Sequence, residues 1–311
     1  MKRRHIASVV LNYNSAADVE VLLPQLRAQQ DVQHTVIVVD NASPAAETQR
    51  LREVFAQSYP QGVVGSPEKV SSHIRIQSGK ACAYLVLNHE NHGYSSGNNI
   101  ALRLAETLGV DAVLIANPDM RIEDQNYLLG LSAVLFADEK NCIAASRIVG
   151  LDDKDQNPLR EPGFWDEFLW PRFALGRRLG QPASYVMPVT DKEPVPVPKV
   201  SGCCMMLRLR FLQAAGWLDE RVFLYCEEPI LSVKVGRVQG RIMFVSALSA
   251  THAHQRGQKG HASGNMLLFI ESRKYYLNHY STYNSVQRCF LSGSYAILEL
   301  AHRIKLFTTK A

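Results

Sequence analysis

Two polar side chains follow a strongly apolar run, at a point where they could bind a metal ion. Asn117 and Asp119 flank Pro118 directly after Ala112–Ala116, which is apolar throughout, as expected of a strand inside a covered parallel sheet. Proline cannot donate to a β-ladder, so the strand is expected to end there. A carboxylate at the carboxyl end of such a strand suits a hard divalent cation that carries a phosphate-bearing substrate. A plain Asn-Pro-Asp turn without chemistry explains the same three residues.

Glu228 is a candidate general base, because it precedes Pro229 at the expected start of a helix. Proline fits the first turn of a helix, and a carboxylate near that end is favoured by the helix dipole. An ionised carboxylate beside a pocket can accept a proton. A helix-capping acid without a catalytic role fits the same position. Glu227 is the competitor, since adjacent residues at a helix start point in different directions and only one can face a substrate.

Two imidazoles follow a short strand that we predict at residues 241–245. They lie in the segment Thr251-His252-Ala253-His254. A lone histidine is usually structural, but one at the end of a strand beside the proposed site could ligate a metal ion.

Four predicted strands each end in a polar cluster. The strands are expected at residues 6–11, 35–39, 84–87 and 112–116, with amphipathic helices between them. Such strand-helix-strand units pair in parallel, so all four carboxyl ends lie along one edge of the sheet. No GxGxxG follows the first strand, which argues against a dinucleotide dehydrogenase. The four clusters predict a binding face for a nucleotide-like ligand; they are Asn12/Asn14, Asp40/Asn41, residues 91–99 and Asn117/Asp119.

The composition indicates a globular chain with a large core. The 311 residues are 46% hydrophobic, and no run of about 18 apolar residues is present. The apolar run after the basic residues 1–5 ends at Asn12, which is too short for a secretory signal. The six cysteines show no CxxC and no metal spacing, so we expect free thiols in a reducing cytoplasm.

The net charge of +5 is concentrated at the C-terminal end. Residues 273–311 carry six basic side chains and one acid, a balance of 6 − 1 = +5. No nucleic-acid module is apparent, so we expect no nucleic-acid partner. The pattern suits either an interfacial helix on an anionic inner membrane leaflet or a helix packed on the catalytic domain. The apolar and basic residues at helical spacing include Tyr295, Leu298, Ala301, His302 and Lys305.

Two stretches break the regular pattern. Residues 58–80 interrupt the alternation of strands and helices, and we predict an insertion with a short hairpin around residues 74–76. A cluster of aromatic residues could be a sugar-stacking or lipid-facing surface, or a satellite core under a long loop, which is the interpretation we favour. The cluster comprises Phe164, Trp165, Phe168, Trp170, Pro171 and Phe173.

A series of short motifs, taken in chain order, resembles the large inverting family 2 glycosyltransferases, in particular their bacterial rhamnosyltransferase-like branch. The resemblance covers residues 5–260, and the order of the motifs is more specific than any one of them. The motifs are Val9-Val10-Leu11-Asn12-Tyr13-Asn14, Val38-Val39-Asp40-Asn41-Ala42-Ser43, Asn91-His92-Gly93-Tyr94 with Gly97-Asn98-Asn99, Asn117-Pro118-Asp119, Ser201-Gly202, Phe223-Leu224-Tyr225-Cys226-Glu227-Glu228 and His254-Gln255-Arg256-Gly257.

The resemblance implies an α/β glycosyltransferase-A fold, a mixed central sheet with a Rossmann-like nucleotide-binding half. Residues 1–150 would bind the nucleotide sugar, residues 151–260 the acceptor, and residues 261–311 would form a basic, amphipathic helical region. Asp119, in place of the family's DxD motif, and His254 would hold a divalent metal ion, Mg²⁺ or Mn²⁺, and Glu228 would be the catalytic base. The nucleotide would be bound by Asn12, Asn14, Asp40, Asn91, Gly93, Asn98 and Asn117.

The chain departs from the family pattern mainly on the acceptor side. Glu228 replaces an Asp and is one methylene longer, and Pro229-Ile230 replaces a stretch that usually carries a further acid. Lys234 stands where an Arg is common, and Lys259 replaces a Ser.

From the resemblance we expect an inverting, metal-dependent hexosyltransferase that acts in the cytoplasm or on the inner face of the membrane. It would move rhamnose from dTDP-rhamnose to a saccharide or lipid-linked saccharide in surface polysaccharide synthesis. Transfer of another sugar, such as galactose from a UDP donor, is the alternative within this class. A nucleotide-sugar-binding subunit without catalysis is the alternative outside it.

Overall fold

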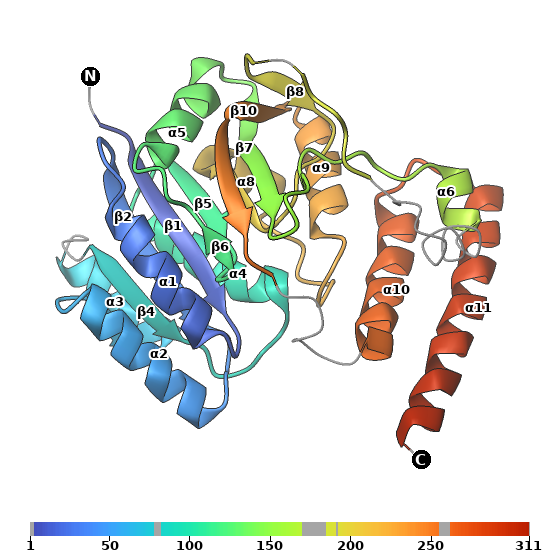
Figure 1. Cartoon of the computed structure of the whole chain (residues 1–311), viewed down its shortest axis with the longest axis horizontal. Coiled ribbons are helices and arrows are strands. Elements are labelled where there is room, and N and C mark those ends of the chain that lie inside the picture. The colour runs from blue at the N-terminus through green and yellow to red at the C-terminus, as the bar shows by residue number, and fades with distance from the viewer. Residues whose placement is uncertain (1–2, 78–81, 170–184, 191, 255–261, 311) are drawn as a thin grey trace.

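A mixed central β-sheet organises the chain, with helices on both faces (Figure 1). The structure, a computed structural model, describes residues 3–77, 82–169, 185–190, 192–254 and 262–310. The strands are β1 (His5–Asn12), β2 (Gln33–Asp40), β3 (Val63–Gly65), β4 (Ala83–Leu87), β5 (Ala112–Ala116), β6 (Met120–Arg121), β7 (Asn141–Gly150), β8 (Val195–Val197), β9 (Cys204–Arg208) and β10 (Arg241–His252). The helices are α1 (Ala16–Arg27), α2 (Ala45–Ser58), α3 (Pro67–Gln77), α4 (Tyr94–Thr107), α5 (Tyr127–Ala137), α6 (Phe164–Phe168), α8 (Leu209–Ala215), α9 (Glu227–Arg237), α10 (Ala262–His279) and α11 (Ser285–Lys310).

The first half of the sheet is parallel and the second half is mixed. Strands β3, β4, β2, β1 and β5 lie side by side in that order and run in the same direction. Strand β9 then pairs antiparallel with both β5 and β7, and β7 pairs parallel with β10. Strand β10 pairs antiparallel with β6 and with β8. The predicted fold class, an α/β fold with a mixed central sheet and a Rossmann-like first half, is therefore confirmed.

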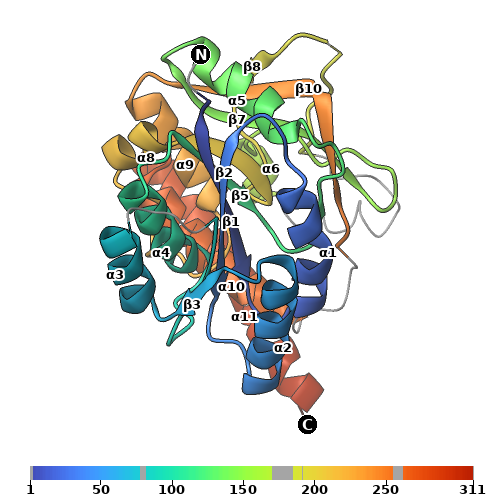
Figure 2. The same ribbon diagram turned by 90° about the vertical axis from the view of Figure 1, so that its left-hand side faces the viewer.

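The central strands are apolar on both faces because helices cover both. Ile6 and Val10 of β1 join the core under α1, α2 and α5, whereas Ala7 and Val9 join the core under α3, α4, α8 and α9. Figure 2 shows the sheet nearly edge-on, with α1 and α2 on one side and α3 and α4 on the other. Burial on both faces explains why these strands read as continuous apolar runs rather than as alternating ones.

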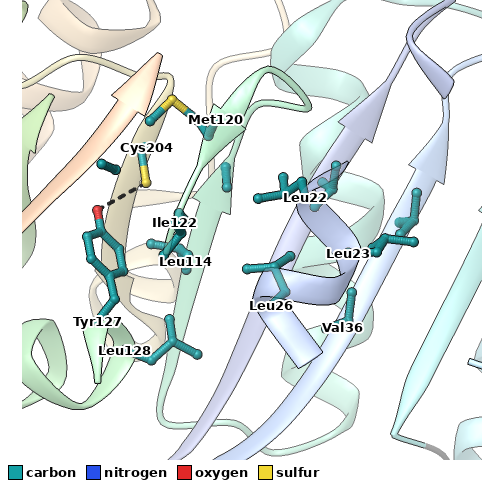
Figure 3. Packing of buried hydrophobic residues seen from close by; sticks show 14 of the residues in the cluster. Leu22, Leu23, Leu26, Val36, Leu114, Met120, Ile122, Tyr127, Leu128 and Cys204 are labelled. Atoms are coloured by element: carbon teal, nitrogen blue, oxygen red, sulfur yellow. Dashed lines mark hydrogen bonds between the residues drawn. The ribbon is translucent and has the colours of Figure 1, made fainter. Parts of the chain in front are cut away.

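The first of these cores is closely packed around α1. Its side chains Leu22, Leu23 and Leu26 lie against the sheet and are fully buried (Figure 3). Tyr127 of α5 places its hydroxyl 3.3 Å from the thiol of Cys204 in β9, so even the polar end of this buried ring has a partner.

The predicted strands at residues 6–11, 35–39, 84–87 and 112–116 correspond to β1, β2, β4 and β5. The hairpin expected around residues 74–76 is wrong, because these residues belong to α3. Val70 and Ile74 are four residues apart and both buried, which is the spacing of one helix face. The strand expected at residues 241–245 is longer than predicted and continues to His252.

Three helices form a satellite core beside the sheet. Helix α10 packs on α11, and α6 packs against α11 (Figure 1). Phe164 and Phe168 of α6 stack with ring centroids 5.8 Å apart and meet Tyr283 and Phe290 edge to face. The satellite-core interpretation is thus correct for Phe164 and Phe168, whereas Trp165 is 66% exposed, and Trp170, Pro171 and Phe173 lie outside the described residues. Within the described chain, every helix is too short or too polar to cross a membrane.

A buried ion pair links the helices of the satellite core. The guanidinium of Arg273 in α10 donates two hydrogen bonds to Glu167 of α6, at 2.6 and 2.8 Å, and a third contact of 2.7 Å reaches Glu161. The Arg273 and Glu167 side chains are only 4% and 3% exposed. Tyr295 of α11 donates to the same Glu167 carboxylate at 2.8 Å. One acid therefore holds α6, α10 and α11 together.

Removing the cation from this pair should destabilise the protein strongly. We expect Arg273→Met to lower the free energy of unfolding by about 3–5 kcal/mol, because Glu167 would stay buried without its charge partner. Arg303→Met is the matched control. It removes an exposed pair with Glu299 on one helix face and should cost about 0.5 kcal/mol or less. Urea unfolding measures both, and equal losses would contradict the assignment.

Candidate active site

The end of β10 and the short strand β6 bring together residues that are far apart in the sequence. Their antiparallel pairing aligns His252 with Met120, and the Ala253 N–H donates to the Asp119 carbonyl at 2.8 Å. As a result, Asp119 lies beside both His252 and His254 at the carboxyl edge of the parallel strands. The predicted neighbours Asp119 and His254 are 135 positions apart, and the structure places them 3.3 Å from each other.

The three side chains form a cluster that could hold a metal ion. Nε2 of His252 lies 3.4 Å from Oδ1 of Asp119, and Nδ1 of His254 lies 3.3 Å from Oδ2. All three ligand atoms lie within 4.8 Å of one another. One carboxylate oxygen and two imidazole nitrogens form a mixed ligand set. Such a set suits a divalent transition metal such as Mn²⁺. The residues present therefore fit the predicted divalent metal.

The sequence drew attention to both imidazoles, but only His254 was assigned as a metal ligand, and the structure adds His252 to the cluster. Its Nδ1 lies 2.7 Å from Oε1 of Gln156, which leaves Nε2 directed at the Asp119 carboxylate. A hydrogen bond on the outer ring nitrogen is the usual way in which a protein orients a histidine ligand. The two rings stack at 5.6 Å. The two-residue spacing of His252 and His254 was the signal in the sequence, because alternate residues of an extended chain share one face.

The polar clusters meet along one edge, as the parallel order of β1, β2, β4 and β5 requires. Asp40, at the end of β2, accepts hydrogen bonds from the Asn12 amide at 3.0 Å and from the Thr48 hydroxyl at 2.6 Å. The Asn12 amide also donates to the Ser43 hydroxyl at 3.3 Å, and its oxygen accepts from the Ser15 N–H at 3.2 Å. These bonds tie the loop after β1 to the loop after β2.

A second set of amides joins the loops after β2 and β4. Asn41 donates to Oδ1 of Asn91 at 2.9 Å and accepts from the amide of Asn88 at 2.9 Å. Oδ1 of Asn91 also accepts from the Gly93 N–H. Gly93 has a φ of 97°, and a Cβ there would lie 2.1 Å from the Phe223 carbonyl oxygen. Glycine is required at this position both by the dihedral and by the close approach of the two backbones.

The predicted nucleotide-binding side chains differ in their access to solvent. Asn12 and Asn98 are fully buried, so in this conformation they support the loops from inside. Asn98 donates to the Tyr94 carbonyl at 2.9 Å. Asn14 is exposed, with its backbone in the left-handed region, and Asn91 and Asn117 are partly exposed. Contact of any of these residues with a nucleotide stays a prediction.

Glu228 is connected to the turn that carries Asp119 through two consecutive residues, Gly202 and Cys203. Its Oε1 accepts the Gly202 N–H at 3.1 Å, and the Gly202 carbonyl accepts the Tyr94 hydroxyl at 2.8 Å. The next residue, Cys203, accepts the Asn117 N–H at 2.7 Å through its carbonyl. A Cβ at Gly202 would lie 3.1 Å from Oε1 of Glu228, so glycine leaves room for the carboxylate.

Glu227 occupies a different environment from its neighbour. Its side chain is 8% exposed, and its Oε1 has no hydrogen-bond partner among the described residues. Burial, together with the adjacent Glu228 charge, raises the pKa of Glu227 to about 8. At neutral pH Glu227 therefore keeps its proton for most of the time.

Comparison with known proteins agrees with this architecture. No protein-family model matches the chain. The low-salt glycan biosynthesis hexosyltransferase Agl10 of Haloferax volcanii is 24% identical over 251 residues, which are 79% of this chain and 66% of that protein. The chain thus spans just under two thirds of the length of this curated relative.

Several solved structures share the fold. The mannosyltransferase PcManGT from Pyrobaculum calidifontis, in complex with GDP-Man and Mn²⁺, has a TM-score of 0.58 and 15% identity, covering 97% of this chain and 72% of its own. GalNAc-T7 with UDP, GalNAc and Mn²⁺ also scores 0.58, at 13% identity, 94% of this chain and 55% of its own. S. aureus TarS with UDP-GlcNAc scores 0.55 at 15% identity, covering 94% of this chain and 71% of its own. The chain is glycosyltransferase-like, and its fold is of the glycosyltransferase-A type, as predicted.

Loss of Asp119 or of His252 from the candidate metal-binding cluster should weaken metal-dependent nucleotide binding. We expect Asp119→Asn and His252→Ala each to reduce the Mn²⁺-dependent affinity for UDP or dTDP by at least about tenfold, because each removes one ligand. His279→Ala, on the exposed side of α10, is the control and should leave the affinity unchanged. Calorimetric titration with and without Mn²⁺ measures the effect. Wild-type metal dependence in Asp119→Asn would reassign Asn117-Pro118-Asp119 to a plain turn.

The raised pKa of Glu227 makes stability depend on pH. The folded state binds this proton more tightly than the unfolded chain, whose ordinary value is 4.5. The stabilisation is fully present below pH 4.5 and is lost as the pH rises to about 8, by at most about 1.4 kcal/mol per pH unit. Glu227→Gln should flatten this slope, whereas the exposed Glu271→Gln should keep it. Urea unfolding across this pH window tests the difference, and equal slopes would refute it.

Proposed function

We propose that the protein transfers a hexose from a nucleoside-diphosphate sugar to an acceptor hydroxyl, with inversion at the anomeric carbon. The observation that carries the proposal is the cluster of Asp119, His252 and His254 on the same sheet edge as the polar loops, connected through Gly202 and Cys203 to Glu228. The hexosyltransferase relative and the nucleotide-sugar complexes of proteins with the same fold support it.

Glu228 is the proposed general base. Its carboxylate takes the proton of the acceptor hydroxyl, and the hydroxyl oxygen bonds to the anomeric carbon while the bond from that carbon to the diphosphate breaks on the opposite face. The proton ends on Glu228 and the electron pair on the departing nucleoside diphosphate. The Gly202 N–H, 3.1 Å from Oε1, orients the carboxylate. Glu227 suits this role less well, because burial keeps its proton in place at neutral pH.

The donor is proposed to lie along the polar edge of the parallel strands. Asn14, Asn91 and Asn117 reach the surface there and can contact the nucleotide directly, while the buried Asn12 and Asp40 fix the loops that carry them. Gly93 and Asn98, predicted as ligand contacts, would act at the start of α4. Asp119, His252 and His254 would hold a divalent cation such as Mg²⁺ or Mn²⁺, which would supply positive charge to the diphosphate.

The finer identity of the reaction rests on the motif resemblance. We propose dTDP-rhamnose as the donor, a saccharide or lipid-linked saccharide as the acceptor, and surface polysaccharide synthesis at the cytoplasmic side of the membrane as the setting. Residues 1–150 would form the donor half, residues 151–260 the acceptor half, and residues 261–311 the helical C-terminal region. A UDP-galactose donor is the alternative. A screen of nucleotide sugars by thermal shift, with and without Mn²⁺, separates the donors.

Replacement of the proposed base should abolish most of the transfer while sparing donor binding. We expect Glu228→Gln to lower the rate by about 10²–10⁴, because the amide keeps the size but cannot accept a proton. Glu228→Asp should retain part of the activity. Donor affinity, measured by calorimetry, should stay near wild type, since the group acts on the acceptor.

Glu227→Gln is the matched control for this test, because it changes the neighbouring acid in the same way. It should transfer sugar within about tenfold of the wild-type rate. The reverse outcome, with only Glu227→Gln inactive, would make Glu227 the base. Tight donor binding without transfer to acceptors, and without slow hydrolysis of the donor by the wild-type protein, would indicate a binding subunit instead of an enzyme.

A further inference from the structure

Helix α11 carries a largely exposed apolar stripe on the side opposite the residues that it packs against α10, and Phe290 of the stripe also meets the Phe168 ring of α6. Its large side chains are between 55% and 79% exposed, and they recur at intervals of four and three residues, with Gly293 in the same series. This spacing keeps them on one face of the helix. The stripe consists of Val286, Phe290, Ile297, Leu300, Ile304 and Phe307.

The opposite face of α11 is buried against the rest of the satellite core. Leu291, Tyr295 and Leu298 are at most 8% exposed and belong to the core shared with α10. Figure 1 shows α11 beyond α10, on the far side from the sheet. The face predicted from the sequence for membrane contact, which includes Tyr295 and Leu298, is therefore the packed one. The stripe is a second apolar face, and each of its large side chains is more than half exposed.

Near its C-terminal end the stripe is bordered by basic residues. Arg303 and Lys305 are both exposed and flank Ile304 in the sequence, so at 3.6 residues per turn they border the stripe on opposite sides. Glu299 is the only acid in residues 285–310, and it is held by Lys274 at 2.6 Å and by Arg303 at 2.8 Å. An apolar face between two basic edges is the arrangement that an anionic lipid surface complements, with the apolar side chains in the acyl region and the cations at the headgroups.

We propose that this face of α11 docks on an anionic membrane surface. A second copy of the chain fits it less well. A seam between two copies would bring basic edges of the same sign together. The inference does not rest on sugar transfer, although a membrane-docked α11 would bring the protein to a lipid-linked acceptor.

Vesicle flotation with the full chain tests the proposal without any measurement of transfer. The probes are vesicles of phosphatidylcholine alone and of phosphatidylcholine with phosphatidylglycerol. We expect binding to the anionic vesicles only, falling as salt rises. The double variant Ile297→Ser/Leu300→Ser should bind at least about tenfold more weakly, since two apolar anchors are lost. Arg303→Gln and Lys305→Gln should each cost about fivefold on anionic vesicles.

Ile76→Ser is the matched control, because Ile76 is 81% exposed but stands alone on α3. It should float like the wild type. Circular dichroism and sedimentation of each variant accompany the assay. Equal recovery on neutral and anionic vesicles, or unchanged binding of the double variant, would overturn the proposal. So would a wild-type dimer that does not float and that Ile297→Ser/Leu300→Ser converts to monomer, since the stripe would then be covered by a second copy.

Discussion

The candidate site depends on the antiparallel pairing of β6 with the end of β10. This pairing is only two residues long, yet it fixes the position of Asp119 against two histidines that come more than 130 residues later. A slip of one residue in β10 would turn His252 and His254 to the other face of the strand. The register is set upstream, where β10 skips from Val245 to Ser249 in its pairing with β7. That bulge decides which side chains of the strand face Asp119.

The parallel half of the sheet could be predicted from the sequence because its information is local. Each strand is an apolar run closed by a polar cluster, and right-handed crossovers then dictate that the clusters share an edge. The hydrogen bonds from Asn12 to Asp40 and from Asn41 to Asn91 are the physical outcome of that rule. The error at residues 74–76 was also local, since the alternation Ile74-Arg75-Ile76 suits a strand, whereas in α3 Ile74 is buried and Ile76 is exposed.

What the sequence could not provide was the outcome of long-range contacts. His252 could not be assigned to the cluster from the sequence, because its position depends on the continuation of β10 to this residue and on the pairing of β10 with β6. The buried face of α11 likewise depends on long-range contacts. Two apolar faces of α11 are visible in the sequence, but which one is buried depends on the position of α10, and the contact of α10 with Glu167 is made through Arg273. The two adjacent acids likewise differ only through burial, which no local pattern reveals.

The C-terminal helices also support the part of the candidate site around Glu228. Tyr275 of α10 and Tyr280, which directly follows this helix, donate to Asp219 at 3.0 and 2.5 Å, and Ser272 donates to the Leu224 carbonyl at 2.7 Å. These bonds hold the segment that leads into Glu227 and Glu228. The last two residues of this segment before α9, Tyr225 and Cys226, adopt left-handed backbone dihedrals that residues other than glycine rarely take. Such a conformation persists only when surrounding contacts enforce it, and here α10 supplies several of them. Residues 261–311 therefore contribute to the geometry of the proposed base as well as to the outer surface, so a chain cut at residue 260 would lose contacts that position Glu228.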